Sequence, residues 1–89
     1  MKPVIDESLV EFRDNGDGSH DLDVRELLLA GGEPLPSIMK CVDPLGHDET
    51  LRVHALFEPA PLMRKLGRQG FKLQSDHAGP DHWVLTVRR

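Results

Sequence analysis

The chain has 89 residues and a formal net charge of −4, with 15 acidic residues against 11 lysines and arginines. This length forms one small domain and leaves no material for a second independent core. Nucleic-acid-binding proteins usually carry a stripe of basic residues. The excess of acidic residues in this chain argues against that function. No apolar run approaches the roughly 20 residues that cross a bilayer. We therefore expect neither a nucleic-acid nor a membrane partner.

Cys41 is the single cysteine of the chain, so no disulfide can form within it. The first residues, Met-Lys-Pro-Val-Ile-Asp-Glu, contain no apolar signal core. Both features favour a reducing, cytoplasmic location. No sequence motif calls for a cofactor, and we expect none.

Residues 1–19 lie outside the regular pattern of the rest of the chain. Residues 8–13 (Ser-Leu-Val-Glu-Phe-Arg) predict an extra edge strand, and the Asp-Asn-Gly-Asp-Gly run at 14–18 predicts a tight turn after it. The alternative is an acidic N-terminal extension without regular structure. Both interpretations stay open. The principal domain is expected to span residues 20–89.

Alternation of apolar and polar residues predicts four strands in this domain. Successive side chains of a strand point to opposite faces, so this alternation places the apolar residues in the core and the polar residues toward solvent. They lie at residues 22–24, 51–57, 71–74 and 83–88. The loop at 76–81 is expected to join the last two strands into a hairpin.

Two helices are predicted between the strands. In the first, Leu35, Ile38, Met39 and Val42 fall on one face at helical spacing, and Pro34 or Pro36 suits the first turn. The second runs from about residue 59 to 69 and ends at a glycine, residue 70, that suits a left-handed cap.

The order of elements is therefore β-α-β-α-β-β. Because every strand is apolar on one side only, both helices must cover the same sheet face. We expect an α/β (α+β) two-layer sandwich with a four-stranded mixed sheet and a possible extra N-terminal strand. The other sheet face is expected to be open and polar, with His54 on it.

The order of elements and two short motifs resemble the TusA-like (SirA-like) family of sulfur-relay proteins, which read roughly Leu-Asp-x-Arg-Gly-x-x-Cys-Pro-x-Pro. This chain has Leu-Asp-Val-Arg-Glu-Leu at 22–27 and Glu-Pro-Leu-Pro at 33–36. The resemblance covers about residues 20–89 and implies the same two-layer sandwich. In that family the motif cysteine carries a persulfide, and Glu33 stands at its position here.

Later segments are similar to a branch of the same superfamily that lacks the motif cysteine, a group of bacterial domains of unknown function. They include Glu-Pro-Ala-Pro-Leu at 58–62 and Gly-Pro-Asp-His-Trp-Val-Leu-Thr-Val at 79–87. That branch commonly has a histidine before the acid that precedes the Pro-x-Pro, where this chain has Phe57.

Candidate binding residues cluster at the helices. Glu33 at a helix start can cap a backbone N–H or accept a bond from a basic partner. Pro34 and Pro36 either open the helix by fixing φ or contribute to a site. Arg64 and Arg68, with the neighbouring lysines, form either a solvated helix face or a docking patch for an acidic partner.

Two chemical alternatives involve cysteine and histidine. Cys41 is a candidate sulfur site, although its place two turns into the first helix favours a half-buried apolar role. His77 and His82 flank the last hairpin, close enough to meet, and are weak candidates for a metal site, which needs three or four converging ligands. Incidental surface histidines are the plainer interpretation.

The sequence thus favours a non-catalytic module that binds another protein or a small ligand, and not an enzyme. We expect a monomer or a weak homodimer. The resemblance implies a relation to sulfur-carrier proteins. The alternatives are a sulfur-relay protein or regulator that uses Cys41, and a metal-binding protein that uses His77 and His82.

Overall fold

The computed structural model describes residues 9–89, which form one five-stranded sheet and three helices. The elements are, in chain order, β1 (Glu11–Asp14), β2 (Ser19–Asp23), α1 (Arg25–Leu29), α2 (Leu35–Val42), β3 (Thr50–Ala55), α3 (Ala60–Arg68), β4 (Lys72–Gly79) and β5 (His82–Arg88). The strand order across the sheet is β1-β2-β3-β5-β4. Strands β2 and β3 are parallel, and the other pairs are antiparallel.

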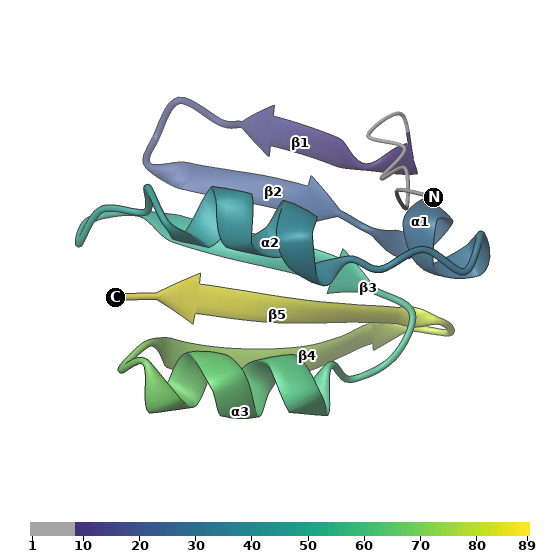
Figure 1. The fold of residues 1–89 in the computed structure, drawn as a ribbon. Helices are drawn as coiled ribbons and strands as arrows, with labels where there is room; N and C mark the ends of the chain where they lie inside the picture. The colour runs from purple at the N-terminus through teal and green to yellow at the C-terminus, as the bar shows by residue number, and fades with distance from the viewer. Residues whose placement is uncertain (1–8) are drawn as a thin grey trace, which may run out of the picture.

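Helices α2 and α3 cover the same face of the sheet, α2 over β2 and β3 and α3 over the β5–β4 end (Figure 1). The core lies between these helices and the sheet, as the one-sided alternation of the strands predicts. Its strand residues are at most 4% exposed. They are Leu22, Leu51, Val53, Ala55, Leu85 and Val87. The helices contribute Ile38, Val42, Leu62 and Leu66.

The predicted two-layer α/β architecture is confirmed, but the four-stranded sheet is wrong by one strand. Strand β1 adds to the edge of β2, from the pair Glu11 and Asp23 to the pair Asp14 and His20. The turn between them uses Gly16 and Gly18 at positive φ, 78° and 86°. All four residues of β1 are exposed, so its sequence does not need the alternation of apolar and polar residues that identifies a half-buried strand. The strand alternative is thus confirmed for residues 11–14, while residues 1–8 lie outside the described part.

Two further elements differ from the prediction. Helix α1 occupies part of a segment expected to be a loop, and Leu27 is its one buried residue. Five residues are too few for a helical period to show in the sequence. Strand β4 runs to Gly79, beyond the predicted residue 74, because pairing with β5 continues there without a buried face. Only Pro80 and Asp81 form the turn, with Asp81 at φ 53°.

The predicted helix ends agree with the structure. Helix α2 begins directly after Pro34, and α3 is followed by Gly70 at φ 91°, the left-handed conformation that glycine adopts readily. Within residues 9–89 no helix is long and apolar enough to cross a membrane.

Candidate functional site

A pocket of about 520 Å³ opens on the helix-covered side of the sheet, and we call it the helix-face pocket. It lies where the parallel strands β2 and β3 end, a position at which open α/β sheets commonly bind ligands. The lining residues come from the β2 and β3 ends, from α1 and the loop after it, and from the starts of α2 and α3. They are Val24, Leu28, Gly32, Glu33, Pro34, Leu35, Ile38, Val53, Ala55, Phe57, Pro59, Pro61, Leu62 and Lys65.

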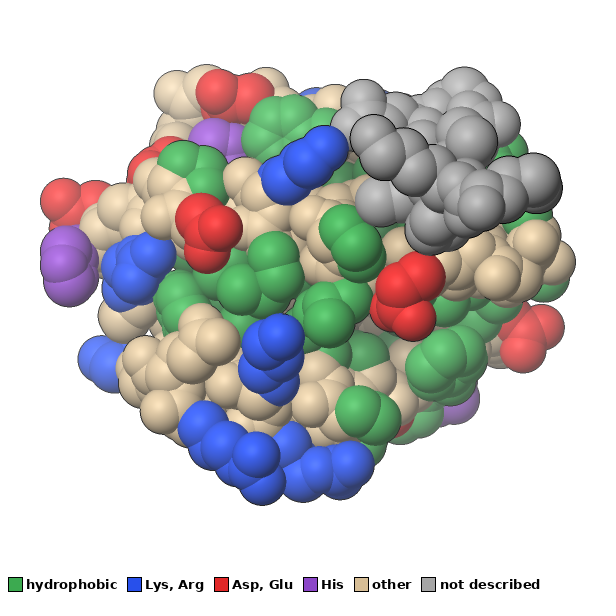
Figure 2. All heavy atoms as spheres, viewed as in Figure 1, with side chains coloured by type: hydrophobic (Ala, Val, Ile, Leu, Met, Phe, Trp, Pro, Cys, Tyr) green, Lys and Arg blue, Asp and Glu red, His purple; other side chains and the backbone are tan. Residues whose placement is uncertain are grey.

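The helix-face pocket lies between the starts of α2 and α3, over the ends of β2 and β3. Both helices start with prolines, which fix φ and lack an N–H that the first turn would leave unbonded. Val53 and Ala55 on β3 form the floor, and Leu35 and Leu62 form opposite walls. Phe57 at the rim is 55% exposed. In Figure 2 apolar side chains fill the groove between the two helices, with charged groups around it.

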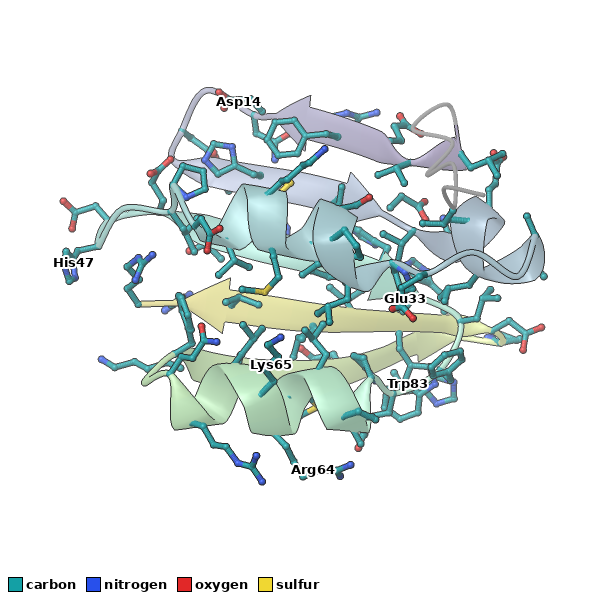
Figure 3. All side chains as sticks on the ribbon, viewed as in Figure 1. Asp14, Glu33, His47, Arg64, Lys65 and Trp83 are labelled. Atoms are coloured by element: carbon teal, nitrogen blue, oxygen red, sulfur yellow. The ribbon has the colours of Figure 1, made fainter. Side chains whose placement is uncertain are left out.

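Two charged residues stand among this apolar lining, Glu33 before α2 and Lys65 on α3 (Figure 3). Glu33 Oε1 accepts a hydrogen bond from the Leu35 N–H at 3.3 Å, so the predicted capping role is confirmed. Lys65 makes no hydrogen bond or ion pair with the residues that the structure describes. Lys65 is therefore available to an anionic group of a ligand.

Of the other predicted binding residues, Pro34 lines this pocket, whereas Pro36, Arg64 and Arg68 lie outside it. Pro36 is exposed on α2 and does not line it. Arg64 and Arg68 are exposed on α3, and Arg64 points away from the sheet (Figure 3). The proline motifs and Glu33 indicated this region in the sequence, and Phe57 was noted there only as the residue in place of a histidine. Val53 carried no signal apart from its apolar character.

Cys41 lies on α2 near its C-terminal end and contacts the edge of the core, half-buried as predicted. Burial raises the pKa of its thiol. It does not line the helix-face pocket, but a smaller depression with Phe12 and His20. A half-buried thiol with a raised pKa is a poor nucleophile, because the thiolate is the reactive form.

The two histidines expected to meet at the last hairpin do not meet. His77 pairs with Trp83 on the helix-covered face and stacks on it, with ring centroids 4.4 Å apart. His82 precedes Trp83 on β5 and therefore points to the opposite face, where it contacts His54. Strand parity explains the correction. Among residues 9–89 no group of three or more His, Cys, Asp or Glu side chains has the arrangement of a metal site.

The remaining histidines lie elsewhere. His20 Nε2 is 2.6 Å from Glu49 Oε2. Its ring stacks on Phe12 with centroids 5.7 Å apart. His47 is exposed in the loop before β3. His54 points to the open sheet face, as its parity predicted, and its contacts are described below.

Comparison with known proteins gives one family and no individual relative. Neither a curated protein nor a solved structure matches the chain significantly. A family model described as "Uncharacterized conserved protein (DUF2249)" matches residues 21–89. This range begins within β2 and includes every residue of the helix-face pocket. The chain therefore belongs to the family of uncharacterised conserved proteins DUF2249.

Proposed function

We propose that this domain is a non-catalytic binding module that holds a small, largely apolar ligand with an anionic group in the helix-face pocket. The observation that carries the proposal is Lys65, a lysine without a partner among the described residues, set in an otherwise mostly apolar lining. A volume of about 520 Å³ falls within the range of small-molecule sites.

The chemistry of the lining selects the ligand class. Three prolines, Leu35 and Phe57 offer apolar surface whose burial by a ligand is favourable in proportion to area. Lys65 would hold a carboxylate, sulfonate or phosphate of that ligand as a compact charge. Glu33, at the other side of the opening, would disfavour a second anionic group nearby.

The resemblance to TusA-like proteins supports the same location. Glu33 stands at the position of their motif cysteine, and it lines the helix-face pocket. With a carboxylate in place of the thiol, this position cannot carry a persulfide, which favours binding over sulfur transfer. The alternative that uses Cys41 has less support, because burial raises the pKa of that thiol and Cys41 lies outside the pocket.

The first experiment is a titration with 1-anilinonaphthalene-8-sulfonate, an apolar probe with one anionic group. We expect saturable binding that Lys65→Gln weakens several-fold. Arg64→Gln is the matched control, since it removes the same charge from the residue directly before Lys65, which does not line the pocket. Equal affinities of both variants and the wild type would refute the role of Lys65.

Two further measurements complete the test. A cooperative unfolding transition must be recorded for each variant, because loosely packed proteins bind this probe without a specific site. Native mass spectrometry of untagged protein isolated gently from its own cells would then show the mass of a retained small molecule. A retained protein partner in place of a small ligand would contradict the proposal and favour a docking function.

A further inference from the structure

The open face of the sheet carries a row of three hydrogen-bonded side chains from three adjacent strands, which we call the histidine row. Its members are Asp21 on β2, His54 on β3 and His82 on β5. His54 Nε2 lies 2.9 Å from Asp21 Oδ1, and His54 Nδ1 lies 2.9 Å from His82 Nε2. The two imidazoles and the carboxylate are therefore connected in series.

The chemistry of Asp21 determines where the protons of the row lie. An ionised carboxylate only accepts hydrogen bonds, so the His54 Nε2–H donates to Asp21. His54 Nδ1 then has a lone pair and accepts the His82 Nε2–H. The lone pair of neutral His82 must consequently be on its Nδ1. The row thus fixes the tautomer of both histidines.

Asp21 is held firmly in its ionised form. Arg52 donates two hydrogen bonds to it, Nε to Oδ1 at 2.9 Å and Nη2 to Oδ2 at 3.0 Å. Asn15 Nδ2 donates a third at 2.8 Å. The Arg52 guanidinium, followed by the bonds from His54 and Asn15, keeps the pKa of Asp21 well below its usual range.

The other end of the row is open. His82 Nδ1 has no partner among residues 9–89. In the same range His20 Nδ1 is the only buried side-chain nitrogen or oxygen without a hydrogen bond. His82 Nδ1 is therefore accessible to solvent. His82 lines a cavity of about 290 Å³ that we call the open-face cavity. Its wall also presents the carboxylates of Glu11 and Asp23 and the guanidiniums of Arg13 and Arg25.

We propose that the open-face cavity is a second site, in which His82 takes a proton from a small polar molecule while His54 and Asp21 act as positioning residues. A base whose second nitrogen is oriented by a further group is the arrangement that proton-transfer sites share. The ligand class follows from the wall. Neighbouring guanidiniums and carboxylates suit a molecule that both donates and accepts hydrogen bonds and carries a weakly acidic O–H or N–H.

The step is a simple proton transfer. The O–H or N–H bond of the ligand breaks, its electron pair stays on the ligand, and an N–H bond forms at His82 Nδ1. The imidazolium keeps its Nε2–H bond to His54, and Asp21 stabilises the added charge through the row. Burial, then Arg25 and His54, lower the pKa of His82, so the base form predominates at neutral pH. This site is independent of the helix-face pocket, which lies on the other side of the sheet.

The test uses diethyl pyrocarbonate on the full chain at pH 6, with mass spectrometry to follow each histidine. His82 Nδ1 attacks a carbonyl carbon of diethyl pyrocarbonate, an N–C bond forms, and the ethyl carbonate anion leaves. The Nε2 proton of His82 then passes to His54 Nδ1. We expect His82 to react several-fold faster than His47, although His47 is more exposed. Asp21→Asn and His54→Gln should each slow the reaction of His82 and shift its pH profile, with no change at His47.

The control for position is His77, which is exposed and stacked on Trp83 but belongs to no such row. Its rate should be unchanged in both variants. If Asp21→Asn does not fold, Asn15→Ala removes one bond to Asp21 and should give a smaller slowing in the same direction. The proposal is overturned if His82 reacts no faster than His47, or if folded variants leave its rate and pH profile unchanged.

Discussion

Val53 and His54 are consecutive residues of β3 whose side chains serve opposite faces of one sheet. Val53 lies in the floor of the helix-face pocket, and His54 is the middle member of the histidine row. The His54 carbonyl also accepts the Val24 N–H at 3.0 Å, which joins the end of β2 to the same strand. The central strand therefore carries both candidate sites within two residues.

Core packing gives the simplest prediction. Leu85 on β5 is 0% exposed, so Leu85→Ala leaves a cavity between the sheet and the helices. We expect the free energy of unfolding to fall by about 2–5 kcal/mol, measured by urea denaturation. Leu29→Ala is the matched control, because Leu29 is 75% exposed. Its effect should stay within about 0.5 kcal/mol. If both variants lost the same free energy of unfolding, the placement of Leu85 in the core would be wrong.

The ion pair of Asp21 and Arg52 predicts an acid-sensitive contribution to stability. Asp21→Asn should lower the free energy of unfolding at pH 7 by about 1.5–3 kcal/mol, since charged hydrogen bonds are lost. Arg52 lowers the pKa of Asp21, so the native carboxylate stays ionised where the unfolded chain takes up a proton. The contribution is present above the unfolded pKa of about 3.9 and is lost as the pH falls below it.

Urea denaturation between pH 7 and pH 2 measures this effect. The stability difference between wild type and Asp21→Asn should narrow below about pH 4. Glu11→Gln is the control, because the Glu11 side chain is 72% exposed and its ion pair with Arg13 is long, 3.6 Å. A constant difference across the pH range would show that Asp21 is not held in its ionised form.

His82 predicts a second pH dependence, at milder pH. Burial, then Arg25 and His54, lower its pKa in the folded state. The unfolded chain therefore takes up the proton at higher pH, and stability is lost as the pH falls through the unfolded pKa of about 6.5. We expect His82→Gln to flatten the stability curve between pH 7.5 and pH 5 in thermal unfolding. His47→Gln should leave the slope unchanged, and an equal flattening would refute the assignment.

We expect the thiol of Cys41 to react slowly with alkylating reagents. Because burial raises its pKa, alkylation by iodoacetamide at pH 7.5 should be much slower in the folded protein than in urea. Cys41→Ala should bind the anilinonaphthalene probe as tightly as the wild type, since Cys41 does not line the helix-face pocket. Fast labelling of the folded protein would instead support the sulfur-relay alternative.

Several features of the sites could be read from the sequence. The Pro-x-Pro motifs and Glu33 indicated where a helix begins, and the structure places that helix start at the helix-face pocket. The parity of His54 relative to Leu51 and Val53 indicated the open face. The same rule applied to His82, next to Trp83, would have separated it from His77. The expected contact between His77 and His82 relied only on their closeness along the hairpin. That closeness does not place two side chains on one face, because successive strand residues point to opposite faces.

The sequence by itself determined the alternation of strands and helices and the side of each strand that is buried. These are local properties, set by residue spacing and by prolines and glycines that fix the backbone. It did not determine β1, whose residues are all exposed, or the extension of β4, which depends on its partner strand.

Only the tertiary structure decided which side chains meet. Asp21, His54 and His82 are 28 to 33 residues apart where they contact one another, and they meet because the strand order places β3 between β2 and β5. The helix-face pocket likewise combines residues from β3, α2 and α3, which are separate segments of the sequence. Such contacts depend on strand order and helix packing, which burial of the whole core selects and no single segment encodes.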